Sequence, residues 1–329
     1  MSTLAPTLEA FFTERLLTQR RASPRTVAAY RDTFRLLLNF AHEQRGKAPS
    51  QLDIADLDAP LIGDFLNWLE RDRHNGVRTR NARLAAIHSL FRYAALRHPE
   101  HANVIQHVLA IPSKRYERSV VNFLNQDEID ALLAATDRTT WTGRRDHALL
   151  VLAIQTGLRI SELTGLVVGD FELGVGAHVR CRGKGRKQRA TPLTTQTVAV
   201  LRVWVRERGG CPTDPAFPTL RGGPLSSDAV QWLLAKYVSL AAQRCPSLGH
   251  KKVSPHTLRH TCAMNLLHAG VDPTVIALWL GHESVQTTQI YLQADLALKE
   301  KAISRTAPPD TKPGRYRPPD KLLAFLEAL

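Results

Sequence analysis

The segment SPHTLRHT, residues 254–261, places an imidazole and a guanidinium group three positions apart at the start of a predicted helix. Ser254 suits an N-cap and Pro255 suits the first helical position, so we expect the helix to begin here. Residues three apart share a helix face, so His256 and Arg259 could together bind a phosphate and move a proton. His260 points about 100° away from Arg259, and we expect a structural role for it.

The segment TGLRISEL, residues 156–163, supplies a second arginine, with a carboxylate three residues later. Arg159 and Glu162 lie at the start of a predicted helix and can share a face. A buried arginine needs an acceptor that fixes the orientation of its guanidinium group, and Glu162 could be that support. Taken alone, the pair is more typical of an ordinary helix surface than of a functional site.

Residues 177–193, AHVRCRGKGRKQRATPL, predict two short strands joined by a GKG turn. Lys184 would lie at the tip, where its ammonium group could donate a proton to a leaving oxygen, with Lys187 as a rival for that role. Other basic residues of the hairpin are expected to contact flanking phosphates: Arg180, Arg182, Arg186, Lys187 and Arg189. A solvated charged turn would explain the same run.

A tyrosine and another histidine follow a third short helix. The dipeptide at residues 272–273, Asp-Pro, predicts its start, and Gly281 its end, with His282 directly after it. Tyr291 lies on the next predicted helix. A phenol has a pKa of about 10, so attack at neutral pH needs proton removal or nearby cations.

Composition indicates a polyanionic partner. The 329 residues include 44 Lys and Arg against 30 Asp and Glu, a formal charge of +14, which favours nucleic acid. The four cysteines form no CxxC pair and no zinc-like spacing, so we expect no metal site and a reducing compartment. We expect no signal peptide and no membrane span, because no long apolar run occurs.

The chain divides into four regions. Residues 1–112 show apolar residues at helical spacing in four segments and predict a helical domain. Residues 113–120 read as a basic linker, and residues 121–305 as a second domain of helices around the strand pair. Residues 306–329 form an extension rich in proline and charge, ending in a short apolar helix.

The order of these features resembles the tyrosine recombinase (phage integrase) family, especially its Xer-like bacterial members. TGLRISEL, HTLRHT, WLGHESVQTTQIY and TRNARLAAIHSLFRYA carry the resemblance, which covers nearly the whole chain. It implies a mainly α fold with a small β-sheet or hairpin. The N-terminal part would be a four-helix core-binding, SAM-like domain, and the remainder an α+β catalytic domain. Every catalytic position of the family has a fitting residue here.

The resemblance implies that Tyr291 attacks a DNA phosphate, forming a 3′-phosphotyrosine and freeing a 5′ hydroxyl. Arg159 and Arg259 would clamp the non-bridging oxygens and stabilise the charge of the transition state. The phosphotyrosine keeps the bond energy, so the reaction would need no ATP, no metal and no other cofactor. A Holliday junction would form when strands exchange between two duplexes.

The remaining site residues also take their roles from the resemblance. Lys184 would be the general acid, and His256 would take the tyrosine proton or assist its transfer. His282 would donate a hydrogen bond to the phosphate, and Glu162 would support the arginines without reacting.

The expected partner is double-stranded DNA that carries a specific recombination site, bound by a homotetramer in the cytoplasm at the nucleoid. Arg78, Arg80 and Arg83, at the start of the fourth helix, are expected phosphate contacts, although a solvated helix edge fits as well. The terminal helix within residues 319–329 would dock onto a neighbouring protomer, or else onto its own domain. An accessory protein or a second recombinase could share the reaction.

Two other functions also fit the sequence. A type IB topoisomerase uses the same chemistry but relaxes supercoils without paired sites. A sequence-specific DNA-binding regulator would bind without cleaving. The Xer-like N-terminal helices and the tail argue against the first, and the complete set of site residues argues against the second. Integration or excision of a mobile element and resolution of a replicon both fit the recombinase.

Overall fold

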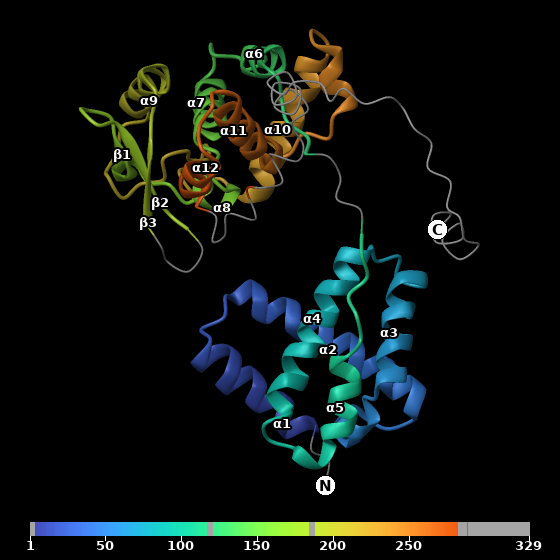
Figure 1. The fold of residues 1–329 in the computed structure, drawn as a ribbon. Coiled ribbons are helices and arrows are strands. Elements are labelled where there is room, and N and C mark those ends of the chain that lie inside the picture. The colour runs from blue at the N-terminus through green and yellow to red at the C-terminus, as the bar shows by residue number, and fades with distance from the viewer. Residues whose placement is uncertain (1–3, 117–120, 184–187, 282–287, 289–329) are drawn as a thin grey trace, which may run out of the picture. The chain divides into compact units, whose positions relative to one another are not determined.

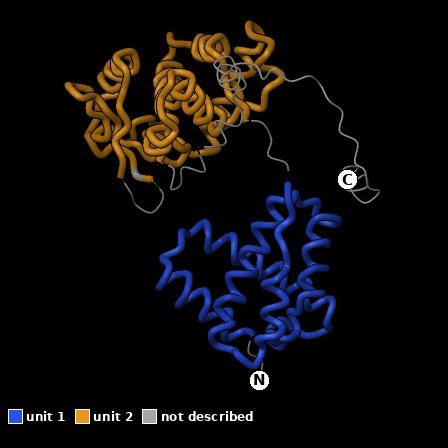
Figure 2. The backbone as a smooth tube through the Cα atoms, in the orientation of Figure 1, with its two compact units in different colours: residues 1–119 blue, residues 120–329 orange. Residues whose placement is uncertain are grey.

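The computed structural model describes residues 4–116, 121–183, 188–281 and 288, and the chain forms two compact units, Met1–Ser119 and Val120–Leu329 (Figure 2). Each unit has its own apolar core. The described part is mostly helical, with one small sheet, as the sequence predicted (Figure 1). Among the described helices, none is long and apolar enough to cross a membrane.

The first unit is helical throughout its described residues. Its helices are α1 (Leu4–Ala10), the π-helix η1 (Phe11–Gln19), α2 (Pro24–Arg45), α3 (Ala59–Arg71), α4 (Val77–Ala94) and α5 (Ala102–Leu109), with short 3₁₀ turns η2 (Pro49–Gln51), η3 (Ile54–Asp56) and η4 (Pro99–His101). Aromatic rings fill the core, with Phe11, Phe65 and Phe91 almost fully buried. The four apolar repeats that the sequence showed lie on α1 together with η1, on α2, on α3 and on α4.

Local signals explain where these helices begin and end. The Ser23 hydroxyl accepts a hydrogen bond from the Thr26 amide at 3.2 Å, and Pro24 opens α2. Gly46 ends α2 with φ +68°, a conformation that costs glycine little. Ser23, Pro24 and Gly46 thus act as ordinary start and stop signals of a helix. The eight-residue α5 was not predicted, because a helix of two turns has too short an apolar repeat.

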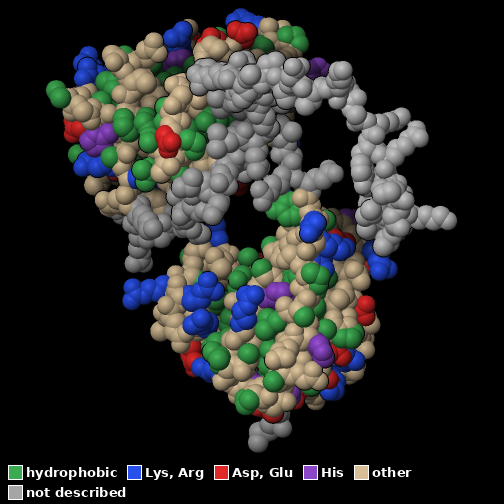
Figure 3. All heavy atoms as spheres, viewed as in Figure 1, with side chains coloured by type: hydrophobic (Ala, Val, Ile, Leu, Met, Phe, Trp, Pro, Cys, Tyr) green, Lys and Arg blue, Asp and Glu red, His purple; other side chains and the backbone are tan. Residues whose placement is uncertain are grey.

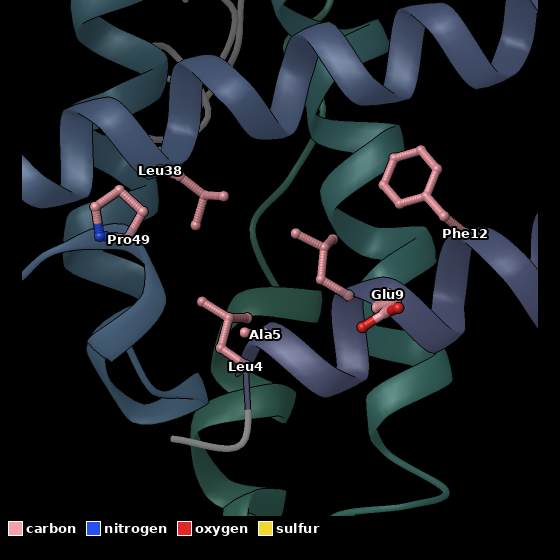
Figure 4. Close-up of a pocket in the computed structure, with 7 residues that line it drawn as sticks. Leu4, Ala5, Glu9, Phe12, Leu38 and Pro49 are labelled. Carbon is pink, nitrogen blue, oxygen red and sulfur yellow. The ribbon is translucent and has the colours of Figure 1, made fainter. Parts of the chain in front are cut away.

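An apolar hollow of about 300 Å³ lies among α1, η1, α2 and η2 of the first unit (Figure 4). Its lining consists of Leu4, Ala5, Leu8, Glu9, Phe12, Leu38 and Pro49. Glu9 is the one ionisable residue among these described side chains. The hollow therefore lacks the cations that phosphate chemistry needs.

The second unit surrounds a small antiparallel sheet with helices. Its elements are α6 (Gln126–Ala134), α7 (Trp141–Thr156), α8 (Ile160–Thr164), the 3₁₀ turns η5 (Val168–Asp170) and η7 (Pro246–His250), strands β1 (Phe171–Glu172), β2 (His178–Arg182) and β3 (Gln188–Pro192), and helices α9 (Thr195–Arg208), α10 (Ser227–Ala242), α11 (Pro255–His268) and α12 (Pro273–Leu280). The buried helix α7 packs against α9 and α11 (Figure 1).

The strand pair that the sequence predicted is confirmed, with Cys181 opposite Arg189. A third strand, β1, pairs with β2 and was not predicted, since two residues carry no alternation. The caps of α11 and α12 also agree with prediction: Ser254 accepts from the Thr257 amide, and Asp272 accepts from the Thr274 amide. The helix expected around Tyr291 lies outside the described residues.

Candidate active site at the C-terminal end of helix α12

Arg159 lies between α7 and α8, two residues after Gly157, which ends α7 in a left-handed conformation. Its backbone is extended, with ψ near 149°, so it precedes the first turn of α8. Its Nη1 donates to Glu162 Oε1 at 2.9 Å, and its Nη2 donates to the carbonyl oxygen of Gly281 at 2.8 Å. The side chain stays one-third exposed. These contacts use two of the five N–H donors of a guanidinium group.

Glu162 is the centre of the cluster. Its carboxylate, with 3% of the side chain exposed, accepts from the Arg159 amide and from two guanidinium groups. Burial alone would raise the pKa of Glu162, but the hydrogen bonds from Arg189 and Arg159 outweigh it and hold the pKa below its usual value. Glu162 is therefore a buried anion, matched by two cations.

Arg259 lies on α11 and is buried, with 3% of its surface exposed. Its Nη1 donates to the carbonyl of Gly157 at 2.7 Å, and its Nη2 donates to the carbonyl of Leu280 at 2.6 Å. Arg159 binds the next carbonyl along, that of Gly281. The two arginines therefore meet at consecutive carbonyl groups, although they lie 100 residues apart in the sequence.

His256 and His260 contact each other edge to face on α11, with ring centres 4.3 Å apart. Burial lowers the pKa of His256, and the positive charges of Arg259 and Arg159 lower it further. His256 is therefore neutral at pH 7, which suits a proton acceptor. Burial and His256 lower the pKa of His260 to about 4.

Two glycines permit this close approach. Gly157 and Gly281 both have positive φ, at +62° and +65°. A Cβ at Gly281 would lie 2.8 Å from Arg189 Nη1, and one at Gly157 would lie 2.6 Å from Leu280 Cδ2. Neither position accepts a side chain without displacing a neighbour.

Three predicted site residues lie outside the described part of the chain: Lys184, His282 and Tyr291. Lys184 belongs to the segment between β2 and β3, and His282 directly follows Gly281. The structure thus brings together Arg159, Glu162, His256 and Arg259.

The expected DNA contacts of the first unit have different surroundings. Arg78 is exposed, and its guanidinium carbon lies 5.0 Å from the centre of the Tyr116 ring. Arg80 is buried, and its Nη1 donates to the carbonyl of Pro112 at 3.3 Å. Arg83 is half-buried. Lys and Arg side chains gather on the face of this unit that Figure 3 shows. Arg80 is thus the one of the three turned inward.

The basic residues of the hairpin also differ. Arg180 is exposed and donates to the carbonyl of Gly169 at 2.8 Å. The side chain of Arg182, together with Arg186 and Lys187, lies outside the described residues. Arg189 does not point to solvent: both of its Nη atoms donate to Glu162 at 2.8 Å, and 14% of its side chain is exposed.

Sequence reasoning assigned Arg189 to flanking phosphates and missed this place in the cluster. A signal was present, because alternate residues of a strand share a face. Arg189 shares its face with Thr191, which is fully buried. An arginine on the inward face of a strand needs a buried acceptor.

The arrangement suits a phosphate anion. It offers two guanidinium groups fixed by carbonyl and carboxylate acceptors, with a neutral imidazole beside them. In the part of the chain that the structure describes, no three His, Cys, Asp or Glu residues come close enough to hold a metal ion.

Comparison with known proteins identifies the class. Residues 122–297 match the phage integrase family, and residues 10–98 match the N-terminal SAM-like domain of phage integrases. The chain therefore belongs to the tyrosine recombinase (phage integrase) family, and it is an enzyme of that type.

Individual relatives extend over most of the chain. The integrase/recombinase-type protein y4rC of Sinorhizobium fredii is 57% identical over 328 residues, which cover 100% of this chain and 99% of that protein. Tyrosine recombinase XerC of Syntrophus aciditrophicus is 34% identical and covers 76% of this chain and 81% of its own length.

Solved structures share the fold. The XerH site-specific recombinase bound to palindromic difH substrate, in a post-cleavage complex, has a TM-score of 0.70 at 22% identity, covering 87% of this chain and 81% of that one. The Tn1549 transposon integrase in complex with a circular intermediate DNA has a TM-score of 0.67 at 15% identity, covering 90% and 98%. Both alignments span parts of both units.

Proposed function

We propose that this chain is a site-specific DNA recombinase that cleaves and rejoins double-stranded DNA through Tyr291. The observation that carries the proposal is the meeting of Arg159 and Arg259 on the consecutive carbonyls of Gly281 and Leu280. Two rigid guanidinium groups beside a neutral His256 are what a phosphoryl transfer through a charged transition state requires. The DNA-bound recombinases of the same fold support DNA as the substrate.

In the first step the Tyr291 oxygen bonds to phosphorus as the bond from phosphorus to the 5′ oxygen breaks. His256 takes the phenol proton, and Lys184 gives a proton to the leaving 5′ oxygen. Arg159, Arg259 and His282 bind the non-bridging oxygens. The 5′ hydroxyl of a second duplex then attacks the phosphotyrosine, which releases Tyr291 and forms a Holliday junction.

The working assembly would be a homotetramer on two duplexes, acting on DNA in the cytoplasm. The reaction would serve integration and excision of a mobile element, or resolution of a replicon. The segment 319–329, which lies outside the described residues, would join neighbouring protomers. Deleting it should abolish synaptic complexes and turnover while single-site binding remains; survival of both activities would exclude that role.

The test begins with the target DNA. The protein is incubated with fragmented host DNA in EDTA, covalent complexes are isolated under denaturing conditions, and the attached ends are sequenced. A nicked duplex of the recovered sequence then serves as a suicide substrate, because the cleaved fragment diffuses away and traps the enzyme.

We expect a covalent adduct that persists in EDTA, disappears in Tyr291→Phe and remains in Tyr316→Phe, a control that removes another phenol near the C-terminus. Binding without any adduct would favour a DNA-binding regulator. Relaxation of a supercoiled plasmid without paired sites would favour a topoisomerase. Either result would overturn the proposal.

A further inference from the structure

Arg189 on β3 makes a two-pronged contact with a carboxylate of the active site. Its Nη1 and Nη2 each donate at 2.8 Å to a different oxygen of Glu162. Both side chains are largely buried, with 14% of Arg189 and 3% of Glu162 exposed. Such a paired geometry fixes both groups in orientation as well as distance.

This contact connects three elements. Glu162 belongs to α8 and binds Arg159, whose Nη2 in turn binds the Gly281 carbonyl after α12. Arg189 also lies against Gly281, since a Cβ there would come 2.8 Å from its Nη1. The guanidinium of Arg189 therefore fills the space between β3, α8 and the end of α12.

Charge gives Arg189 a second effect. Without Arg189, Arg159 and Glu162 would form a neutral pair, and the carboxylate would compete with a phosphate for Arg159. With Arg189 present, the three side chains together carry two positive charges and one negative charge. The cluster then keeps a net positive charge for the substrate in a poorly solvated site, where an unmatched charge has a strong effect.

The contacts of Arg189 favour a role other than direct phosphate binding. Both terminal nitrogens of Arg189 already donate to Glu162, and little of its side chain meets solvent.

We propose that Arg189 is a positioning residue that holds Glu162 so that Arg159 can bind and neutralise the scissile phosphate. The inference rests on the proposed function and deepens it. On this inference β3, the second strand of the hairpin, sets the position of Arg159, which belongs to another element.

The experiment compares Arg189→Lys and Arg189→Gln with the wild type in single-turnover cleavage of two suicide substrates. One has an ordinary scissile phosphodiester. The other has a methylphosphonate there, which removes the negative charge of one non-bridging oxygen and so reduces the need for Arg159. Arg144→Lys is the matched control, because Arg144 makes a two-pronged contact with Glu207 between α7 and α9, away from the site.

We expect Arg189→Lys to slow cleavage of the phosphodiester about 10- to 100-fold, as small misplacements of catalytic groups do. On the methylphosphonate the deficit should largely disappear. Arg189→Gln should show the same difference more strongly, and Arg144→Lys should match the wild type on both substrates.

A deficit of equal size on both substrates, or no deficit, would overturn the inference. A variant that fails to fold would show equal deficits on both substrates, together with lost DNA binding and a lower Tm. That result would also count against the inference. If the wild type itself cleaved neither substrate, the proposed function would fail first and the inference would fall with it.

Discussion

Arg259 is a cation that the fold has removed from water, and it therefore depends on the acceptors around it. Its two terminal nitrogens bind the carbonyls of Gly157 and Leu280, which fixes the plane of the guanidinium group. A lysine has one ammonium group and cannot hold both carbonyls and a phosphate in a plane.

We therefore predict that Arg259→Lys slows adduct formation by about 10²- to 10³-fold, the effect of losing one transition-state donor. DNA binding should weaken far less, because we expect most of the DNA contacts to be to other phosphates. Single-turnover cleavage and a gel-shift assay measure the two effects. Equal losses of binding and cleavage would show that Arg259 acts in binding alone.

His260 makes stability depend on pH. Its pKa is lowered from 6.5 to about 4 by burial and by His256, so the unfolded chain takes up a proton between these values that the folded chain refuses. The free energy of unfolding therefore falls as pH drops from 6.5 to 4. After allowance for solvent screening, we expect a loss of about 1–2 kcal/mol from this residue.

His260→Gln should flatten the fall of Tm between pH 7 and pH 4.5, whereas His268→Gln, at an exposed position of the same helix, should leave it steep. Thermal unfolding at both pH values measures the slopes. A wild-type slope retained in His260→Gln would contradict the assignment.

The residue types of the site were predictable, but not all of their contacts. The spacing of His256 and Arg259 gave a shared helix face, and the structure brings both beside Arg159. The contact of Arg189 with Glu162 joins two residues that are 27 positions apart in the sequence, with strands β1 and β2 between them. That pairing depends on how β3 packs against α8, and no local spacing encodes it.

At the scale of elements, the end of α12 fixes the positions of two arginines of the site. Gly281 ends the helix in the left-handed region and offers its carbonyl to Arg159. Its missing side chain leaves room for Arg189. One position thus combines a helix stop with two contacts of the cluster.

We predict that Gly281→Ala lowers the free energy of unfolding by about 1–2 kcal/mol through backbone strain, and that it also slows cleavage by displacing Arg189. Gly46→Ala is the matched control, since it has a similar φ of +68° and nothing within 4 Å of the added Cβ. It should show the strain alone. Chemical denaturation and the cleavage assay separate the two effects, and full activity in Gly281→Ala would contradict this role.

The elements themselves were predicted where a local signal was strong. Ser254 with Pro255 and Asp272 with Pro273 each mark a helix start that the structure confirms. The short α5 and β1 were missed, because they are held by packing and pairing with other elements and not by their own pattern.

At the scale of the whole molecule, the charge of +14 should govern DNA binding. We expect the logarithm of the binding constant to fall with the logarithm of salt concentration with a slope of about −5 or steeper, since each phosphate contact releases a counterion. Fluorescence anisotropy with a labelled target duplex measures the slope. A nearly flat response would contradict a protein that binds mainly through phosphates.

The identity of the residue that carries the DNA tests the central claim most directly. The covalent complex is digested with nuclease and trypsin, and the modified peptide is sequenced by mass spectrometry. Trypsin should release residues 260–299, which contain one tyrosine, Tyr291. We predict a nucleotide on Tyr291, linked through its 3′ phosphate. A nucleotide on any other residue, or one linked through a 5′ phosphate, would contradict the account.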